Sequence, residues 1–126
     1  MHKIKINGYF KNSNLNNIIN YNCYGIKNNN EIEFKNDLDK INICIENHKI
    51  LFKRENPDII MNYEFILNKS TKNNVYRLKK ENLEISFEIN TIKLEITENK
   101  IFVIFNILEI NNNFCNYKLS LNYKVV

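Results

Sequence analysis

The sequence contains no tryptophan, one proline and two glycines in 126 residues. The scarcity of glycine excludes a glycine-rich phosphate-binding loop. It also means that tight turns have to be built from asparagine and aspartate, whose short side chains bond to the local backbone and tolerate positive φ. The three cysteines are an odd number without a CxxC pair, so the sequence indicates neither a disulfide framework nor a zinc site.

Histidine is nearly as scarce, which bears on catalysis. A Cys-His pair would require His48 to meet Cys44 across a predicted hairpin, and no third orienting group or set of zinc ligands accompanies them. We therefore expect a protein that is not an enzyme and has no catalytic residue, bound metal or cofactor. Cys23 and Cys115 fall at positions that predict burial, whereas Cys44 is predicted to be the most exposed thiol.

Long apolar runs are also missing. No stretch approaches the roughly 18 consecutive apolar residues of a membrane span. The amino terminus alternates Ile4 and Ile6 with Lys3 and Lys5, and so lacks the apolar block of a signal peptide. With 44% hydrophobic and 25% charged residues, these features predict a soluble cytoplasmic protein that forms one domain over residues 1–126 and has no membrane partner.

Alternation of apolar and polar residues with a period of two is abundant. Residues 91–126 fall into three apolar segments joined by short polar links, which predicts a β-meander. In the first segment Ile92, Leu94 and Ile96 share one face. The middle segment, residues 101–110, is apolar on both faces, so its outer side is expected to be covered by another part of the chain or by a second copy in a homodimer.

Similar short runs occur throughout the chain. About ten strands at intervals of roughly 8–12 residues, without an amphipathic helix, predict an all-β barrel or sandwich. Asn47 and His48 predict the tight turn of a hairpin, and Gly8 predicts a bend or a close backbone approach. The apolar parity switches across Asn90 and Thr91, which predicts a β-bulge or corner there.

Residues 39–43, 49–54, 61–65 and 83–89, followed by the closing meander, occur in an order that resembles a family of small uncharacterised bacterial β-barrels, the YwiB-like proteins. The resemblance implies a single closed antiparallel lipocalin-like (calycin) β-barrel of about 8–10 short strands in meander order, with no assigned activity. Residues 79–82 depart from the Gly, Thr and aromatic residues that relatives carry there. The Gly-x-Trp signature of secreted lipocalins is absent.

The interior of such a barrel is one candidate site. A barrel of about eight strands is just wide enough to be filled by side chains or to hold one small ligand. Aromatic residues at inward positions could line a cavity, with tyrosine hydroxyls as polar anchors. They are Tyr21, Tyr63, Phe65, Phe87, Phe105 and Tyr117. We expect a binding module for a small apolar or amphipathic ligand; the alternative for the same residues is a packed core.

The densest positive charge lies between residues 69 and 80, which contain no acidic residue. This stretch provides Lys69, Lys72, Tyr76, Arg77, Lys79 and Lys80. Its cations could neutralise phosphates while the tyrosine stacks on a base, so it is an alternative site for nucleic acid or an acidic protein partner. The plainer interpretation is a solvated loop and strand face, because Glu81, Glu84 and Glu88 follow directly.

Overall fold

The computed structural model describes residues 1–12, 17–108 and 114–126, and this part of the chain contains ten strands and no helix. The strands are β1 (His2–Asn12), β2 (Asn17–Asn28), β3 (Glu31–Asn36), β4 (Asp39–Glu46), β5 (Lys49–Glu55), β6 (Ile59–Ile66), β7 (Ser70–Leu78), β8 (Leu83–Thr97), β9 (Lys100–Leu108) and β10 (Phe114–Val125). They form a closed barrel in the order β1-β10-β9-β8-β7-β6-β5-β4-β3-β2. The predicted all-β antiparallel barrel in meander order is confirmed.

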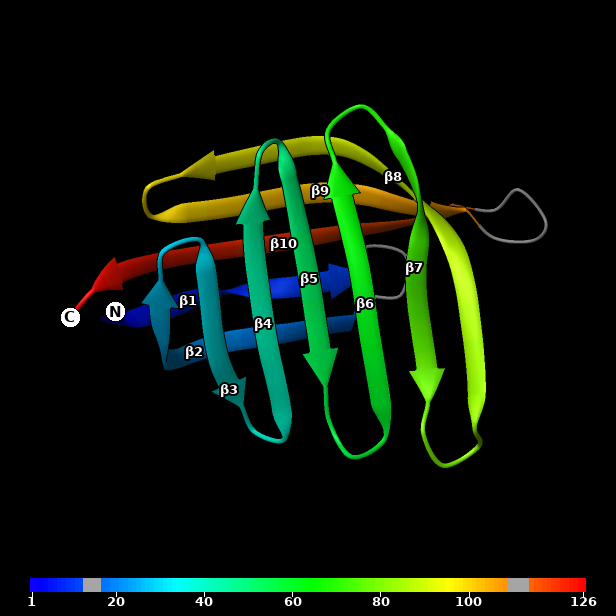
Figure 1. Cartoon of the computed structure of the whole chain (residues 1–126), viewed down its shortest axis with the longest axis horizontal. Helices are drawn as coiled ribbons and strands as arrows, with labels where there is room; N and C mark the ends of the chain where they lie inside the picture. The colour runs from blue at the N-terminus through cyan, green and yellow to red at the C-terminus, as the bar shows by residue number, and fades with distance from the viewer. Residues whose placement is uncertain (13–16, 109–113) are drawn as a thin grey trace.

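The barrel is flattened into two layers whose strands cross (Figure 1). Strands β3 to β7 form the front layer, and β1, β2, β9 and β10 run across behind them. The 15-residue strand β8 belongs to both layers, because it pairs with β7 up to Asn90 and with β9 from Glu88 onward. The register with β9 shifts between Thr91 and Lys93. This irregularity confirms the predicted bulge and lets the strand turn from one layer into the other.

The two ends of the chain close the barrel. β1 pairs with β10 from Ile4 opposite Val125 to Asn12 opposite Tyr117, so the amino and carboxyl ends of the described chain lie side by side (Figure 1). This pairing joins residues more than a hundred positions apart in the sequence.

The turns follow the expectation set by the shortage of glycine. Positive φ angles occur at Asn29, Asp37, His48, Asn68 and Asn82, and at neither glycine. Four of these five residues are asparagine or aspartate, the types that tolerate the left-handed region best after glycine. His48 has φ 57° in the two-residue turn between β4 and β5, which confirms the predicted tight turn.

Gly8 is required by a close backbone approach, as predicted. A Cβ atom built at Gly8 would lie 1.9 Å from the carbonyl oxygen of Ser120 in β10. No side chain can occupy that position without moving the β1–β10 pairing.

The core lies between the two layers and consists of the alternating inward residues of the strands. It is rich in isoleucine and phenylalanine and includes the fully buried Ile6, Ile43, Phe52, Phe65 and Phe105. The predicted alternation of β1, β4, β5 and β6 therefore describes the core correctly. The burial expected for Cys115 concerns a side chain outside the described residues.

The alternation predicts burial less well along β8. Leu83 and Ile85 are exposed because they pair with Leu78 and Tyr76 at the free end of the β7–β8 hairpin. Ile92, expected to share an inward face with Leu94 and Ile96, is 52% exposed because it is the bulge residue that has no partner in β9. Alternation of apolar and polar residues identifies a strand, but it does not show which part of that strand the other layer covers.

Candidate functional site

The six residues predicted to line a cavity fall into two groups. Tyr63, Phe65, Phe87, Phe105 and Tyr117 form one cluster of ring contacts. The ring centroid of Phe105 is 4.6 Å from that of Phe65 and 5.1 Å from that of Tyr117. Aromatic rings at these separations fill the space between the layers. Tyr21 lies apart from them and packs edge-on against Phe34, with centroids 5.3 Å apart.

Beside Tyr21 lies a charged pair that the sequence did not single out. Arg54 shares the inward side of β5 with Ile50 and Phe52, and its Nε atom lies 3.0 Å from Oδ2 of Asp39. The geometry is that of an ion pair and not of a hydrogen bond. Both side chains are largely buried, and the attraction between the two charges offsets part of the hydration that each loses on burial.

The hydroxyl of Tyr21 is buried and has no hydrogen-bond partner among the described residues. Burial raises the pKa of Tyr21 well above its ordinary value of 10.0, and the nearby Arg54 guanidinium only partly opposes that shift. The pKa of Tyr63 is raised for the same reason, with a further contribution from Tyr117. These phenols stay protonated, so they can donate hydrogen bonds to an anionic or carbonyl group.

The predicted basic stretch, residues 69–80, loses part of its charge to neighbouring carboxylates. Lys79 Nζ lies 2.8 Å from Glu55 Oε2, and Lys80 Nζ lies 3.1 Å from Asp58 Oδ1. Arg77 lies opposite Glu84 in the β7–β8 pairing.

The same stretch is also interrupted along its length. Tyr76 is partly buried against the core and not free to stack. The exposed Lys69 and Lys72 are separated from the cations after residue 76 by the buried Asn74. Asn74 borders the bulge of β7, and its Nδ2 donates to the carbonyl oxygens of Thr71 and Phe87. The stretch that is densest in the sequence is therefore not a continuous basic surface.

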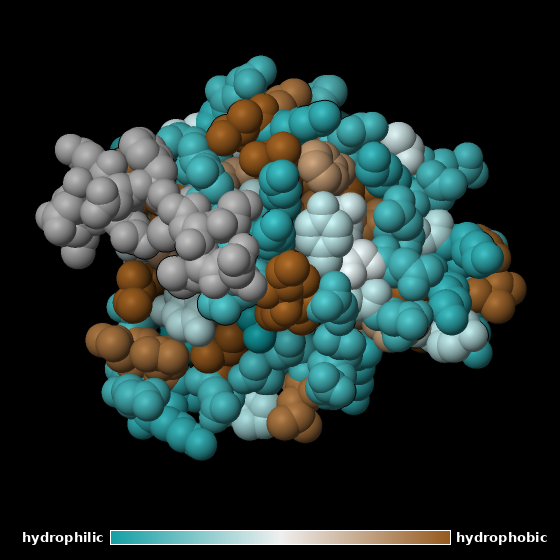
Figure 2. Space-filling view, turned by 180° about the vertical axis from the view of Figure 1, so that it is seen from behind, coloured by the Kyte–Doolittle hydropathy of each residue, from teal (hydrophilic) through white to brown (hydrophobic). Residues whose placement is uncertain are grey.

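A more coherent basic surface lies on the rear layer. None of β1, β2, β9 and β10 contains an aspartate or a glutamate. Their outward positions form what we call the lysine face, and its lysines are Lys3, Lys5, Lys11, Lys100, Lys118 and Lys124. Figure 2 shows this side of the molecule as mainly hydrophilic with small separate apolar patches. No contiguous stretch of the sequence predicts this surface, because it forms only when the first strand pairs with the last.

Lysines lie directly opposite each other across the β1–β10 pairing. Lys5 is opposite Lys124, and Lys11 is opposite Lys118. Like charges at directly opposed positions of an antiparallel pair destabilise the sheet. Among the described residues, no carboxylate forms an ion pair with any of these four side chains.

Polar amides and aromatic rings lie between these two lysine pairs. Asn7 is flanked by Asn22 on β2 and Asn122 on β10. In the next row, Ser120 lies between Tyr9 on β1 and Phe102 on β9. The lysine face therefore combines cations at its ends with amides and rings in its middle.

Two rings of the rear layer are bordered by lysine ammonium groups. Lys3 and Lys5 lie 4.8 and 5.0 Å from the centroid of the Tyr24 ring. Lys93 and Lys100 each lie 5.4 Å from the centroid of the Phe102 ring. These cation–π contacts partly cover Phe102, which belongs to the doubly apolar segment 101–110.

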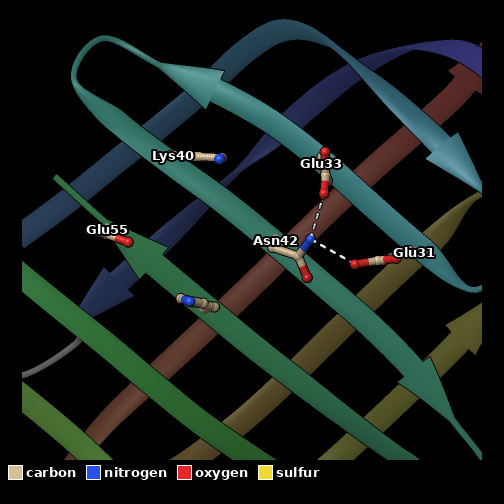
Figure 3. Close-up of a pocket in the computed structure, with 6 residues that line it drawn as sticks. Glu31, Glu33, Lys40, Asn42 and Glu55 are labelled. Atoms are coloured by element: carbon tan, nitrogen blue, oxygen red, sulfur yellow. Dashed lines mark hydrogen bonds between the residues drawn. The ribbon is translucent and has the colours of Figure 1, made fainter.

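The front layer has the opposite character. Figure 3 shows Asn42 of β4 reaching toward Glu31 and Glu33 of β3, and its Nδ2 atom donates to both carboxylates at 2.9 and 3.0 Å. Lys40, Lys53 and Glu55 line the same shallow pocket of about 310 Å³. Charges of both signs alternate here, so this surface is electrostatically balanced. On the lysine face Lys100 lies 4.0 Å from Glu95 of β8, but the four opposed lysines of β1 and β10 have no carboxylate partner among the described residues.

The histidine and cysteine positions bear on the predicted lack of catalysis. Cys44 lies opposite Leu51, beyond the Glu46 and Lys49 that flank the turn holding His48. Burial, Glu46 and Glu31 raise the pKa of the Cys44 thiol, and burial raises that of Cys23, which lowers the thiolate fraction of both. Both thiols are partly buried, so the predicted contrast in exposure is not seen. In the described ranges, no three His, Cys, Asp or Glu side chains are grouped to hold a metal ion.

Across the described ranges, no helix is long and apolar enough to cross a membrane.

Comparison with known proteins gives a likeness in fold. No protein-family model matches the sequence, and no curated protein matches it. The crystal structure of the YwiB protein from Bacillus subtilis superimposes with a TM-score of 0.66 over 98% of this chain and 90% of that one, at 15% sequence identity. The order of strands that resembled YwiB in the sequence is thus shared in three dimensions, and the chain has the fold of this uncharacterised β-barrel.

Proposed function

We propose that this barrel is a non-enzymatic binding module that takes single-stranded nucleic acid on its lysine face. One observation carries the proposal: two lysine pairs are opposed across β1 and β10 without a carboxylate partner among the described residues. Such pairs lower the stability of the free protein. A polyanion would remove the repulsion on binding, and sequence choices that oppose stability are expected mainly at functional sites.

The chemistry of the face fits a single strand. Lys5 and Lys11 are six residues apart on β1, so the two lysine pairs are separated by about 20 Å. Tyr9 and Phe102 between them could stack on bases, and the amides of Asn7 and Asn122 could bond to base edges. A membrane surface fits less well, because the amides in the middle of the face would lose hydration in the lipid interface.

The test is fluorescence anisotropy with a labelled oligouridine at several salt concentrations. Removing two contacts by the double substitution Lys11→Gln and Lys118→Gln should weaken binding and reduce the salt slope by about 1.4, since each phosphate contact on a single strand contributes about 0.7. The matched control is Lys69→Gln with Lys72→Gln, two exposed lysines outside the lysine face. If the control variant lost affinity and the lysine-face variant kept it, the binding site would lie in residues 69–80 instead.

Anionic phospholipid vesicles serve as the second probe for the same proteins. Binding to the vesicles without binding to the oligonucleotide would replace the nucleic-acid proposal with a membrane-surface one.

A second candidate function is the binding of a small amphipathic ligand, in the manner of a lipocalin-like container. The inward-facing Arg54 and the buried hydroxyl of Tyr21, which has no hydrogen-bond partner among the described residues, favour it. Together they offer a donor and a cation to an anionic head group, which would compete with Asp39 for the guanidinium. The ring cluster around Phe105 leaves the apolar tail of such a ligand little interior space. Native mass spectrometry of protein purified from its own cells tests this function: a bound mass that is lost on substituting Arg54→Gln would support it.

A further inference from the structure

The second half of β8 has a free backbone edge. On the side away from β9, the strand pairing with β7 ends at Asn90, and the last backbone hydrogen bonds join Thr91 to Asn68 and Lys69. Within the described chain, no strand pairs with residues 92–97 on that side. These six residues span about 20 Å, and they form the margin of the rear layer in Figure 1.

Apolar side chains accompany this free edge. Ile92 is 52% and Ile96 is 36% exposed, and Leu94 between them is partly buried against the core. An exposed strand edge with unpaired backbone groups and apolar side chains is a template for another strand.

The sequence of the edge is nearly symmetric about its centre. From Thr91 to Thr97 the order is Thr-Ile-Lys-Leu-Glu-Ile-Thr, in which only the lysine and the glutamate on either side of Leu94 break the symmetry. We propose that a second copy of this chain pairs antiparallel with this edge, about a two-fold axis through Leu94. Lys93 then lies opposite the partner's Glu95, and Glu95 lies opposite the partner's Lys93. Each copy offers the same surface, so the contact closes as a dimer.

The charges of Lys93 and Glu95 favour this register over the two neighbouring registers. A shift that keeps the inward faces aligned moves the axis to residue 93 or to residue 95. The first shift places Lys93 against the partner's Lys93, and the second places Glu95 against the partner's Glu95. Directly opposed like charges disfavour both, whereas the register centred on Leu94 makes two attractive pairs. From Lys93 to Thr97 the strand is in regular register with β9, so it supplies both members of the three central pairs, Lys93 with Glu95, Leu94 with Leu94 and Glu95 with Lys93.

Within the described chain, residues 17–24 of β2 also lack a strand partner on one side, but they contain no charged residue to fix a register. A side chain of the same molecule also covers part of this edge, since Asn36 Nδ2 donates to the carbonyl oxygen of Asn20 at 3.4 Å. A copy that joined β2 to β8 would leave a free edge at each end and continue as a filament. The charge pattern therefore favours β8 against β8.

Sedimentation velocity over a concentration series tests the dimer and needs no nucleic acid. Lys93→Glu places a new carboxylate against the partner's Glu95, and Glu95→Lys places a new ammonium group against the partner's Lys93. Each single variant should raise the dimer dissociation constant by about 10–100-fold. Mixing the two variants should restore association as a heterodimer, because the two carboxylates of one chain then meet the two ammonium groups of the other.

Lys72→Glu and Glu84→Lys make the same charge changes at exposed positions of the front layer and should dimerise like the unaltered protein. Four results would overturn the proposal: an unaltered protein that stays monomeric at its highest soluble concentration, a dimer insensitive to both variants, single variants that do not associate when mixed, or open-ended assembly. A dimer that forms through segment 101–110 would be insensitive to both variants and would therefore overturn the proposal.

Discussion

Replacing Lys118 by glutamate should stabilise the free barrel and weaken its binding to nucleic acid. Lys118 is opposite Lys11 across the β1–β10 pairing, and both side chains are partly buried on the lysine face. The substitution exchanges a repulsive cross-strand pair for an attractive one. Cross-strand pairs contribute about 0.2–1 kcal/mol each, so reversing the sign changes the free energy of unfolding by about 1 kcal/mol.

For a domain of this size, about 1 kcal/mol raises the melting temperature by roughly 3–5 °C. Thermal unfolding followed by circular dichroism at low salt measures the gain, which should shrink at high salt as the repulsion in the unaltered protein is screened. The same protein should bind the labelled oligouridine more weakly and with a smaller salt slope. Opposite changes in stability and affinity separate a functional lysine from a structural one.

The result that would refute this reasoning is a Lys118→Glu protein with a lowered melting temperature. It would mean that Lys118 stabilises the sheet, so that the opposed lysines need no ligand to explain them. Lys69→Glu, a charge change of equal size at an exposed position, shows how much of any effect comes from net charge alone.

Three further predictions concern the fold and one of its buried groups. Gly8→Ala should destabilise the barrel by about 1–3 kcal/mol or prevent its closure, because the new methyl group would overlap the Ser120 carbonyl; urea unfolding measures the loss, and an unchanged midpoint would contradict it. Asn74→Leu should cost about 2–4 kcal/mol in the same assay, since it removes the amide that bonds to Thr71 and Phe87 and leaves their carbonyls buried. The pKa of Tyr21 is raised in the fold, so only the unfolded state ionises as the pH passes 10.0, and stability should fall with rising pH; in Tyr21→Phe that fall should be smaller, and equal slopes would refute the assignment.

Much of the fold was predictable because its signals are local. Alternation located the strands, the Asn, Asp and His residues of the turns carried the positive φ angles, and the parity switch near Thr91 marked the bulge. The failures came where local pattern does not determine the surroundings. Leu83 and Ile85 alternate like core residues, yet the hairpin that carries them extends past the cover of the other layer.

The candidate sites were less predictable, for the same reason. The six aromatic residues were predicted to line a ligand cavity, and five of them form one cluster of ring contacts. Their packing against each other could not be read from their positions in the sequence. The lysine face went unrecognised because its charges are sparse along the chain and are brought together by one long-range strand pairing. Arg54 gave no signal either, since a cation at the end of a strand is usually solvated.

Because the pairing of β1 with β10 assembles the lysine face, that face can form only after β10 has been synthesised. The first strand supplies Lys5 and Lys11, and the last supplies the lysines opposite them. A pairing between such distant segments forms late and slowly compared with the hairpins. During synthesis, the edge of β1 that later pairs with β10 has no strand partner. Its backbone groups stay unpaired, and its lysines do not yet face the lysines of β10. Completion of the last strand would therefore close the barrel and assemble the lysine face in one step, and an unfinished chain would have neither.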